Sequence, residues 1–283
     1  MLIDTHAHLN FKEFESDLPQ VLKRANNVGI KKIVMPSSEE ESAKRALKIV
    51  QNNPQVFAAI GVHPLYLVGA GSLFVEDGSP QGFYTKDHSG IEDVFYLKDF
   101  EEMLVNPQVV AIGEIGLDYF SSPHRENPIN RSLQLEVLEK MLQLAVEYKK
   151  PAILHIRTSK NSDDAFWDLI NLVDRLDKKP KMVVHCFSGD LKISKELLAR
   201  GFMISFTNLT FYMEKTKKAF SKIPLDKVML ETDSPFLCPF GNKPRNEPSY
   251  LLDIATKLAD LRDISLKKFS KITTTNAQEF FGI

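Results

Sequence analysis

Histidines and carboxylates recur in this sequence at the places where short apolar runs end. Five of the seven histidines stand in such places, and so do two acidic residues. They are His6, His8, His63, His155, His185, Glu114 and Asp233. Imidazole and carboxylate groups together favour Zn²⁺, Mn²⁺ or another transition-metal ion over an all-oxygen calcium site. A single histidine in such a place is usually structural, but this whole set indicates a metal centre.

The spacing of these residues indicates what the ions would do. If the first strand continues through His6 and His8, residues i and i+2 face the same side, and both imidazoles can chelate one ion. Glu114 has two carboxylate oxygens and can bridge that ion to a second one. The other ligands would come from the remaining candidates, which are His155, His185 and Asp233. Asp233 also suits proton transfer. Two cations about 3.5–4 Å apart can hold a hydroxide and polarise a phosphoryl or carbonyl oxygen, which is hydrolytic chemistry.

Eight short apolar runs that alternate with helical patterns must position these side chains. The predicted strands are residues 2–4, 33–35, 56–62, 109–112, 152–154, 182–184, 202–206 and 228–230. Most of them are apolar throughout, which is typical of parallel strands covered on both faces. The alternation predicts an α/β fold, a (β/α)₈ TIM-type barrel forming one domain over residues 1–283, with a doubly wound open sheet as the alternative. Active sites of such barrels lie at the carboxyl ends of the strands, where all the candidate ligands fall.

A long connection at residues 65–98 interrupts this alternation. Five of the chain's 13 glycines lie within residues 69–90. A loop of this length in a compact domain is typical of a functional lid or mobile insertion, and a tolerated surface insertion is an equal alternative.

Composition excludes several classes of protein. With 36 basic and 37 acidic residues, the chain of 283 residues carries a net charge of −1. This balance excludes a strongly basic nucleic-acid binder, although it permits a local basic groove. Two cysteines give no disulfide framework, and neither a signal peptide nor an apolar run long enough for a membrane span is visible, so we expect a cytoplasmic protein with no obligate protein partner. Glycine-rich phosphate loops and a GxSxG nucleophile elbow are also absent from the sequence.

Six short motifs resemble those of a known family. They are Asp-Thr-His-Ala-His-Leu at 4–9, Gly-Val-His-Pro at 61–64, Gly-Glu-Ile-Gly-Leu-Asp-Tyr at 113–119, His-Cys-Phe-Ser-Gly at 185–189, Glu-Thr-Asp-Ser-Pro at 231–235 and Pro-Arg-Asn-Glu-Pro at 244–248. Together they resemble the TatD family of metal-dependent hydrolases, the TatD-type deoxyribonucleases. Each motif alone is weakly specific, but the set keeps the family order across nearly the whole chain.

The resemblance implies an amidohydrolase-like TIM-type barrel with two divalent ions (Mg²⁺, Mn²⁺ or Zn²⁺) and phosphodiesterase activity. Family members are typically deoxyribonucleases, often 3′–5′ exonucleases, so the implied partner is DNA, as single strands or ends. Carried over by position, the metal ligands are His6, His8, Glu114, His155, His185 and Asp233. Glu114 and Asp233 are the implied catalytic residues. His63 lies beside the scissile phosphate in this reading, and Arg157 and Arg245 contact phosphate.

Three stretches depart from the family pattern, and all lie on predicted βα loops, where substrate choice is made. They are residues 120–125, the long connection at 69–90, and Thr158-Ser159-Lys160. The metal site is therefore better supported than the substrate.

Two alternatives to a nuclease remain open. One is an amidohydrolase-type enzyme acting on a small ester, lactone or amide. Many such enzymes have a carboxylated lysine at the end of strand four, where this chain has Glu114, which disfavours that alternative. The other is a non-catalytic metal-binding scaffold or interaction protein, which the retention of all six ligand-type residues disfavours.

Overall fold

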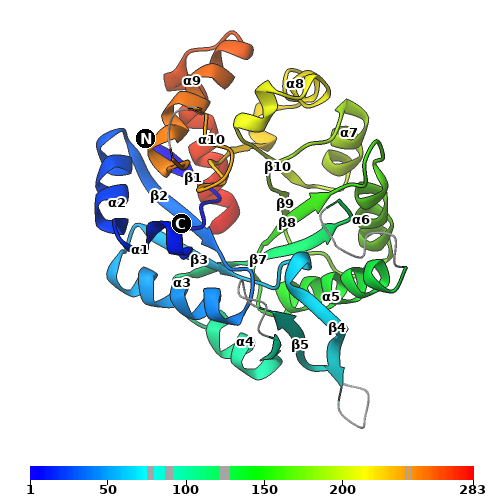
Figure 1. The fold of residues 1–283 in the computed structure, drawn as a ribbon. Helices are drawn as coiled ribbons and strands as arrows, with labels where there is room; N and C mark the ends of the chain where they lie inside the picture. The colour runs from blue at the N-terminus through cyan, green and yellow to red at the C-terminus, as the bar shows by residue number, and fades with distance from the viewer. Residues whose placement is uncertain (75–79, 87–91, 121–127, 240, 242–243) are drawn as a thin grey trace. The chain divides into compact units, whose positions relative to one another are not determined.

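Eight parallel strands follow one another across the main sheet in the same order as along the chain (Figure 1). The computed structural model describes residues 1–74, 80–86, 92–120, 128–239, 241 and 244–283. The parallel strands are β1 (Leu2–Asp4), β2 (Ile30–Pro36), β3 (Val56–Ile60), β7 (Val109–Asp118), β8 (Ala152–Arg157), β9 (Met182–Val184), β10 (Met203–Phe206) and β11 (Val228–Leu230). All eight predicted strands are therefore present. Doubly wound sheets reverse their strand order at a switch point, and this order contains no reversal.

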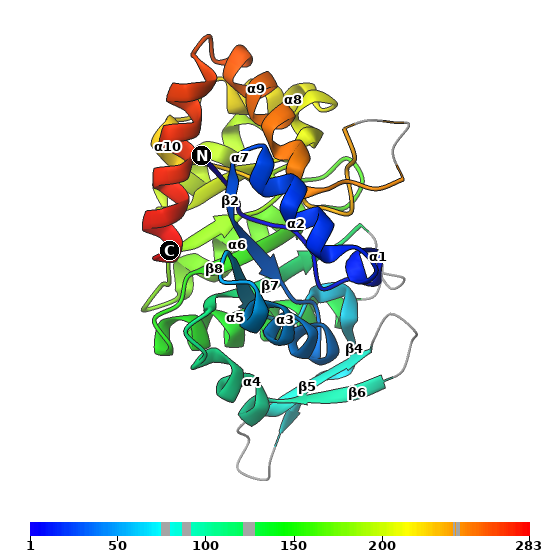
Figure 2. The same cartoon turned by 90° about the vertical axis from the view of Figure 1, so that its left-hand side faces the viewer.

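Helices alternate with these strands (Figures 1 and 2). The α-helices are α1 (Lys12–Glu15), α2 (Leu18–Asn27), α3 (Glu40–Asn52), α4 (Leu97–Leu104), α5 (Pro128–Glu147), α6 (Asp164–Arg175), α7 (Leu191–Ala199), α8 (Glu214–Phe220), α9 (Leu251–Leu261) and α10 (Leu266–Phe281). Short 3₁₀ helices are η1 (Pro64–Tyr66), η2 (Asn208–Phe211), η3 (Leu225–Lys227) and η4 (Pro248–Tyr250). Among the described residues, no helix combines the length and apolar composition needed to cross a bilayer.

The chain divides into two compact units, and the first contains both chain ends. It comprises Met1–Met35, Ile49–Phe57 and Val183–Ile283. Within it, β1 pairs with β2, and β10 pairs with both β9 and β11. Helix α10 packs on β1 and β11, and its buried Asn276 donates from Nδ2 to the carbonyl oxygens of Leu225 at 2.8 Å and Val228 at 2.7 Å. The C-terminal helix thereby fixes the start of β11.

The second unit comprises Pro36–Lys48 and Ala58–Met182. Strand β7 lies between β3 and β8 and pairs in parallel with both. All residues of β7 are buried, and the strand runs to Asp118, well past the end at residue 112 that its apolar run predicts. Glycine and carboxylate residues in the second half of β7 hide this continuation in the sequence, because they are uncommon within strands.

The connection predicted as a long loop at residues 65–98 instead carries three strands. They are β4 (Leu67–Phe74), β5 (Pro80–Lys86) and β6 (Glu92–Tyr96), which form an antiparallel sheet beside α4 (Figure 2). Residues 75–79 and 87–91 of this connection, and residues 121–127 of the divergent loop after Tyr119, lie outside the described residues. Glycine and polar residues break the apolar runs of these strands, so the sequence pattern missed them. A lid function for this segment stays a prediction.

Two helix ends differ from what the sequence pattern predicts. Ser38 followed by Glu41 three residues later fits a capping box at the start of α3. The structure instead uses Glu39, whose carboxylate accepts from the backbone N–H of Ser42 at 2.9 Å, while Ser42 Oγ accepts from the N–H of Glu39 at 3.1 Å. At the C-terminus, the two predicted helices at 266–272 and 276–280 are the single helix α10.

Gly116 is the residue of β7 that is least replaceable. Its φ is +144°, and a Cβ there would overlap the carbonyl oxygen of His155 on β8. We expect Gly116→Ala to lower the free energy of unfolding by at least about 3 kcal/mol, because backbone strain and steric overlap add. Chemical denaturation monitored by circular dichroism measures this loss. The control is Gly241→Ala, where no heavy atom among the described residues lies within 4 Å of the added Cβ. That change should stay within about 0.5 kcal/mol of the wild type, and equal effects of the two variants would contradict the prediction.

Candidate metal centre

The first group of candidate ligands lies in the first unit, just beyond the ends of β1, β9 and β11. The Nε2 atoms of His6 and His8 are 3.1 Å apart. Asp233 Oδ1 lies 3.6 Å from His8 Nε2 and 3.8 Å from His6 Nε2. The ring of His185 stacks on that of His6 with centroids 3.9 Å apart. Four of the six predicted ligands are thus gathered here, and all four are buried.

Backbone hydrogen bonds bring the two distant segments of this group together. The N–H of Asp233 donates to the carbonyl of His6 at 2.9 Å, and the N–H of His8 donates to that of Ser234 at 2.8 Å. Just upstream, the Asp4 carboxylate accepts from the Thr232 hydroxyl at 2.6 Å and from its N–H at 3.0 Å. His6 and His8 therefore follow β1 in a segment paired with residues 232–234, rather than lying on an extension of β1 itself.

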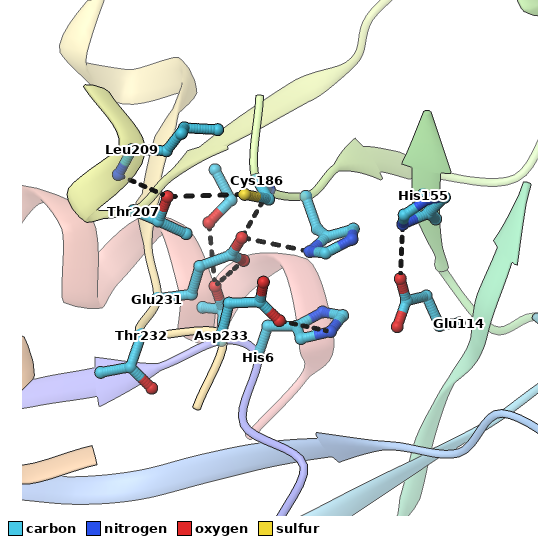
Figure 3. A network of polar contacts seen from close by, with 12 residues as sticks. His6, Glu114, His155, Cys186, Thr207, Leu209, Glu231, Thr232 and Asp233 are labelled. Carbon is cyan, nitrogen blue, oxygen red and sulfur yellow. Dashed lines mark hydrogen bonds and ion pairs between the residues drawn. The ribbon is translucent and has the colours of Figure 1, made fainter. Parts of the chain in front are cut away.

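Glu231 is a member of this group to which the sequence analysis gave no role. Its Oε1 lies 3.3 Å from His185 Nδ1 and accepts from the Cys186 N–H at 2.5 Å, while its Oε2 accepts from the Thr5 hydroxyl at 3.3 Å. Figure 3 shows it beside Cys186, whose Sγ lies 3.5 Å from Thr207 Oγ1. In the sequence, Glu231 could have been recognised as a candidate by its position directly after the predicted strand at 228–230, two residues before Asp233.

The second group lies in the second unit and contains the other two predicted ligands. Glu114 Oε1 is 2.9 Å from His155 Nδ1 and 3.4 Å from His63 Nε2. Figure 3 shows the Glu114–His155 pair. His63 Nδ1 accepts from the backbone N–H of Leu65 at 3.1 Å. A neutral imidazole that accepts at Nδ1 carries its proton on Nε2, so His63 is a hydrogen-bond donor toward Glu114 in this geometry.

Asp118 is the second residue that the sequence analysis left without a role. It is fully buried, and its Oδ2 lies 3.0 Å from His155 Nε2. Its own backbone is held by Gln134, whose Oε1 accepts from the Asp118 N–H at 2.9 Å. When the Asp118 carboxylate accepts a hydrogen bond from the Nε2–H of His155, the Nδ1 lone pair faces Glu114, as in carboxylate–histidine–metal arrangements. In the sequence, Asp118 could have been recognised by its spacing from Glu114, because positions i and i+4 of a strand share a face.

Burial and neighbouring charges shift several of these groups. Burial lowers the pKa of His63, and the Glu114 carboxylate opposes this only in part. Burial also acts to lower the pKa of His155, but its hydrogen bonds to Asp118 and Glu114 outweigh that and raise it. For Asp233, burial acts to raise the pKa, but the contact with His8 and the nearby histidines lower it overall. Asp4 behaves differently, since burial raises its pKa to about 8 despite the hydrogen bonds from Thr232.

The donor atoms of both groups suit a divalent metal ion. In three sets the ligand atoms lie within 4.8 Å of one another. The sets are His6, His185 and Glu231; His6, His8 and Asp233; and His63, Glu114 and His155. Imidazole nitrogen combined with carboxylate oxygen is the ligand chemistry of Zn²⁺, Mn²⁺ and related ions. The residues present therefore fit the ions that the sequence predicts.

The two predicted phosphate-contacting arginines lie in different surroundings. Arg157 ends β8 and is exposed, with its guanidinium 4.3 Å from the centroid of the Phe120 ring. Arg245 instead donates to both oxygens of Asp17 at 2.6 Å and lies over the Phe14 ring. The contacts recorded for Arg245 thus tie the 244–250 segment to α1 and α2, and they include none of the predicted metal ligands.

Comparison with known proteins identifies the family. The family model described as TatD related DNase matches residues 3–282. The chain belongs to this family.

Curated relatives match over their full lengths. The uncharacterized metal-dependent hydrolase YabD of Bacillus subtilis is 32% identical over 290 residues, covering 100% of both chains. The 3′-5′ ssDNA/RNA exonuclease TatD of Citrobacter rodentium is 28% identical over 298 residues, covering 100% of this chain and 98% of that one. The chain is therefore a TatD-family metal-dependent hydrolase.

Solved structures agree on the fold. The crystal structure of YjjV, a TatD homologue from Escherichia coli K12, has a TM-score of 0.78 at 27% identity and covers 100% of this chain and 98% of that one. An uncharacterized amidohydrolase from Saccharomyces cerevisiae has a TM-score of 0.78 at 17% identity, with 99% of each chain covered. These likenesses confirm the predicted amidohydrolase-like TIM-type barrel.

The contact between Asp118 and His155 predicts how a neutral substitution affects metal binding. Asp118→Asn keeps the size of the side chain but removes the charge that orients the His155 ring. We expect the affinity for Mn²⁺ or Zn²⁺ to fall about 10- to 100-fold, measured by calorimetric titration of metal-free protein. The control is Asp168→Asn, because Asp168 accepts a hydrogen bond at 2.8 Å from the Tyr119 hydroxyl rather than from a histidine. Unchanged metal affinity in Asp118→Asn would show that this carboxylate does not support a ligand.

Proposed function

We propose that this chain is a divalent-metal-dependent phosphodiester hydrolase, a deoxyribonuclease of the 3′–5′ exonuclease type acting on single-stranded DNA or DNA ends. The observation that carries the proposal is the presence of two buried imidazole–carboxylate groups in a chain of the TatD family. A relative matched along its whole length is named as an exonuclease on single-stranded DNA and RNA, which supports a nucleic-acid substrate.

Each group would hold one divalent ion. In the first unit the ligands would be His6, His8, His185 and Asp233, and in the second unit Glu114 and His155. Bound ions supply Lewis-acid polarisation of the phosphodiester and of the attacking water. The bridging of two ions by Glu114 stays a prediction, which the number of ions bound per chain tests.

The side chains around the ions have separate tasks in this proposal. Asp233 lies against His6 and His8 and would take the proton of the attacking water. His63, with its proton on Nε2, would donate a hydrogen bond to a phosphate oxygen, because its Nδ1 is already occupied by the Leu65 N–H.

Arg157 and Arg245 differ in their readiness to bind phosphate. Arg157 is exposed and its guanidinium lies over the Phe120 ring, so a phosphate can approach it from solvent. Arg245 would have to exchange its two hydrogen bonds to Asp17 for bonds to the substrate. Arg157 is therefore the better candidate of the two for contact with a phosphate.

A direct assay tests the nuclease activity. With Mg²⁺, Mn²⁺ or Zn²⁺ added, we expect a single-stranded DNA labelled at its 5′ end to shorten progressively from its 3′ end. A chelator should abolish the reaction, since the ions activate the water. The same oligonucleotide in duplex form and as RNA measures strand and sugar preference. Hydrolysis of small esters, lactones or amides with no attack on DNA would favour the amidohydrolase alternative instead.

Removal of the Glu114 carboxylate tests the role of the second group. We expect Glu114→Ala to lower DNA hydrolysis by at least about 100-fold and to reduce the number of ions bound per chain, measured by elemental analysis. The control is Glu136→Ala, an exposed glutamate on α5, which should behave like the wild type. If Glu114→Ala keeps both its metal content and its activity, the assignment of Glu114 as ligand and catalytic residue is wrong.

A further inference from the structure

A half-exposed aromatic ring rests against the first group of metal ligands. Phe236 is 50% exposed, and its ring centroid lies 5.8 Å from that of His8 in an edge-to-face contact. On the buried side, Phe11 stacks on His8 at 4.5 Å and meets the Phe236 ring edge-on at 6.0 Å. The three rings form a continuous cluster in the first unit, in which one surface of Phe236 faces solvent directly beside a candidate ligand.

The loop that carries Phe236 is held by one buried side chain. Asn246 is fully buried, and its Nδ2 donates to the carbonyl oxygens of Thr232 at 2.8 Å and Phe236 at 2.7 Å. Its backbone N–H donates to the carbonyl of Pro235 at 3.0 Å. A single side chain thus fixes both ends of the segment that contains Asp233 and Phe236. The backbone at Phe236 is therefore held in place before any substrate binds, so ordering of this loop costs little conformational entropy on binding.

We propose that Phe236 is a substrate-binding residue whose exposed face stacks on the nucleobase next to the scissile phosphate. This proposal rests on the proposed nuclease function and specifies what the site recognises in its substrate. If an ion bound at His8 holds a phosphate, a ring whose centroid lies 5.8 Å from that of His8 would stand beside the nucleotide that carries this phosphate. Every base offers a π face to an aromatic ring, so such stacking requires a base without selecting its identity. Asn246 acts as the positioning residue that keeps the ring and Asp233 in register.

The proposal predicts a preference for a base that a purely structural phenylalanine would not produce. Stacking of a base on an aromatic side chain is typically worth about tenfold or more in binding. The enzyme should therefore prefer an oligonucleotide with a normal 3′-terminal nucleotide over the same oligonucleotide ending in an abasic residue. It should show little preference among the four bases at that terminus. If Phe236 only shields His8 from water, its loss would slow both substrates equally and lower the metal content.

The experiment compares the two oligonucleotides across variants of the full-length, metal-loaded chain. We expect Phe236→Leu to raise KM for the base-bearing strand about tenfold and to leave kcat and the metal content near those of the wild type. Phe236→Leu keeps an apolar side chain over His8 and removes only the aromatic face, and Phe236→Tyr restores that face. The matched control is Tyr96→Ala, since Tyr96 is similarly exposed, at 48%, but is the last residue of β6 in the second unit.

The outcomes separate this proposal from the nuclease function itself. Loss of the base preference in Phe236→Leu, with its recovery in Phe236→Tyr, supports the stacking role. Degradation of DNA by the wild type with no base preference, or with a preference that Phe236→Leu retains, overturns the stacking role and leaves the nuclease function standing. If the wild type degrades neither oligonucleotide with any of the metals, the nuclease function and the stacking role fall together.

Discussion

The first group of ligands depends on the pairing of two segments that are more than 200 residues apart. Residues 4–8 and 232–234 are joined by backbone hydrogen bonds at His6 and His8 and by the buried contact between Asp4 and Thr232. Because this pairing uses main-chain groups, it sets the positions of His6, His8 and Asp233 without consuming their side chains. Asn246 then holds the continuation of the second segment, because its Nδ2 donates to the carbonyl oxygens of Thr232 and Phe236. The close approach of these candidate ligands is thus a consequence of strand-end pairing.

A second constraint is the pairing of candidate ligand histidines with buried carboxylates. Glu231 lies against His185 in the first unit, and Asp118 lies against His155 in the second. An imidazole has two nitrogens, and a carboxylate at one of them fixes the ring orientation and directs the other. Both carboxylates are almost fully buried, so their charges gain stabilisation from hydrogen bonds rather than from water. The ligand geometry therefore depends on residues that need not touch an ion themselves.

The sequence pattern predicted regular structure well where strands are uniformly apolar and poorly elsewhere. All eight parallel strands were found, because strands covered on both faces leave continuous apolar runs. The second half of β7 was missed, since Glu114, Gly116 and Asp118 stand at alternate positions there and interrupt its apolar run. The strands β4, β5 and β6 were missed because their polar and glycine residues leave no continuous apolar run. In each case the local residue composition is untypical of a strand, although the tertiary structure places the segment in a sheet.

The sequence by itself determined the family and the fold class, because the residue types and their order carry that information directly, and it supplied the six candidate metal ligands. Only the tertiary structure placed Glu231 and Asp118 against candidate ligand histidines, since such contacts arise between segments whose spacing along the chain says nothing about distance. The tertiary structure likewise placed two arginines with the same predicted role in different surroundings. Arg157 stacks on Phe120, whereas Arg245 is bound by Asp17. It also placed Phe236 beside His8, because the hydrogen bonds of Asn246 decide where that loop lies.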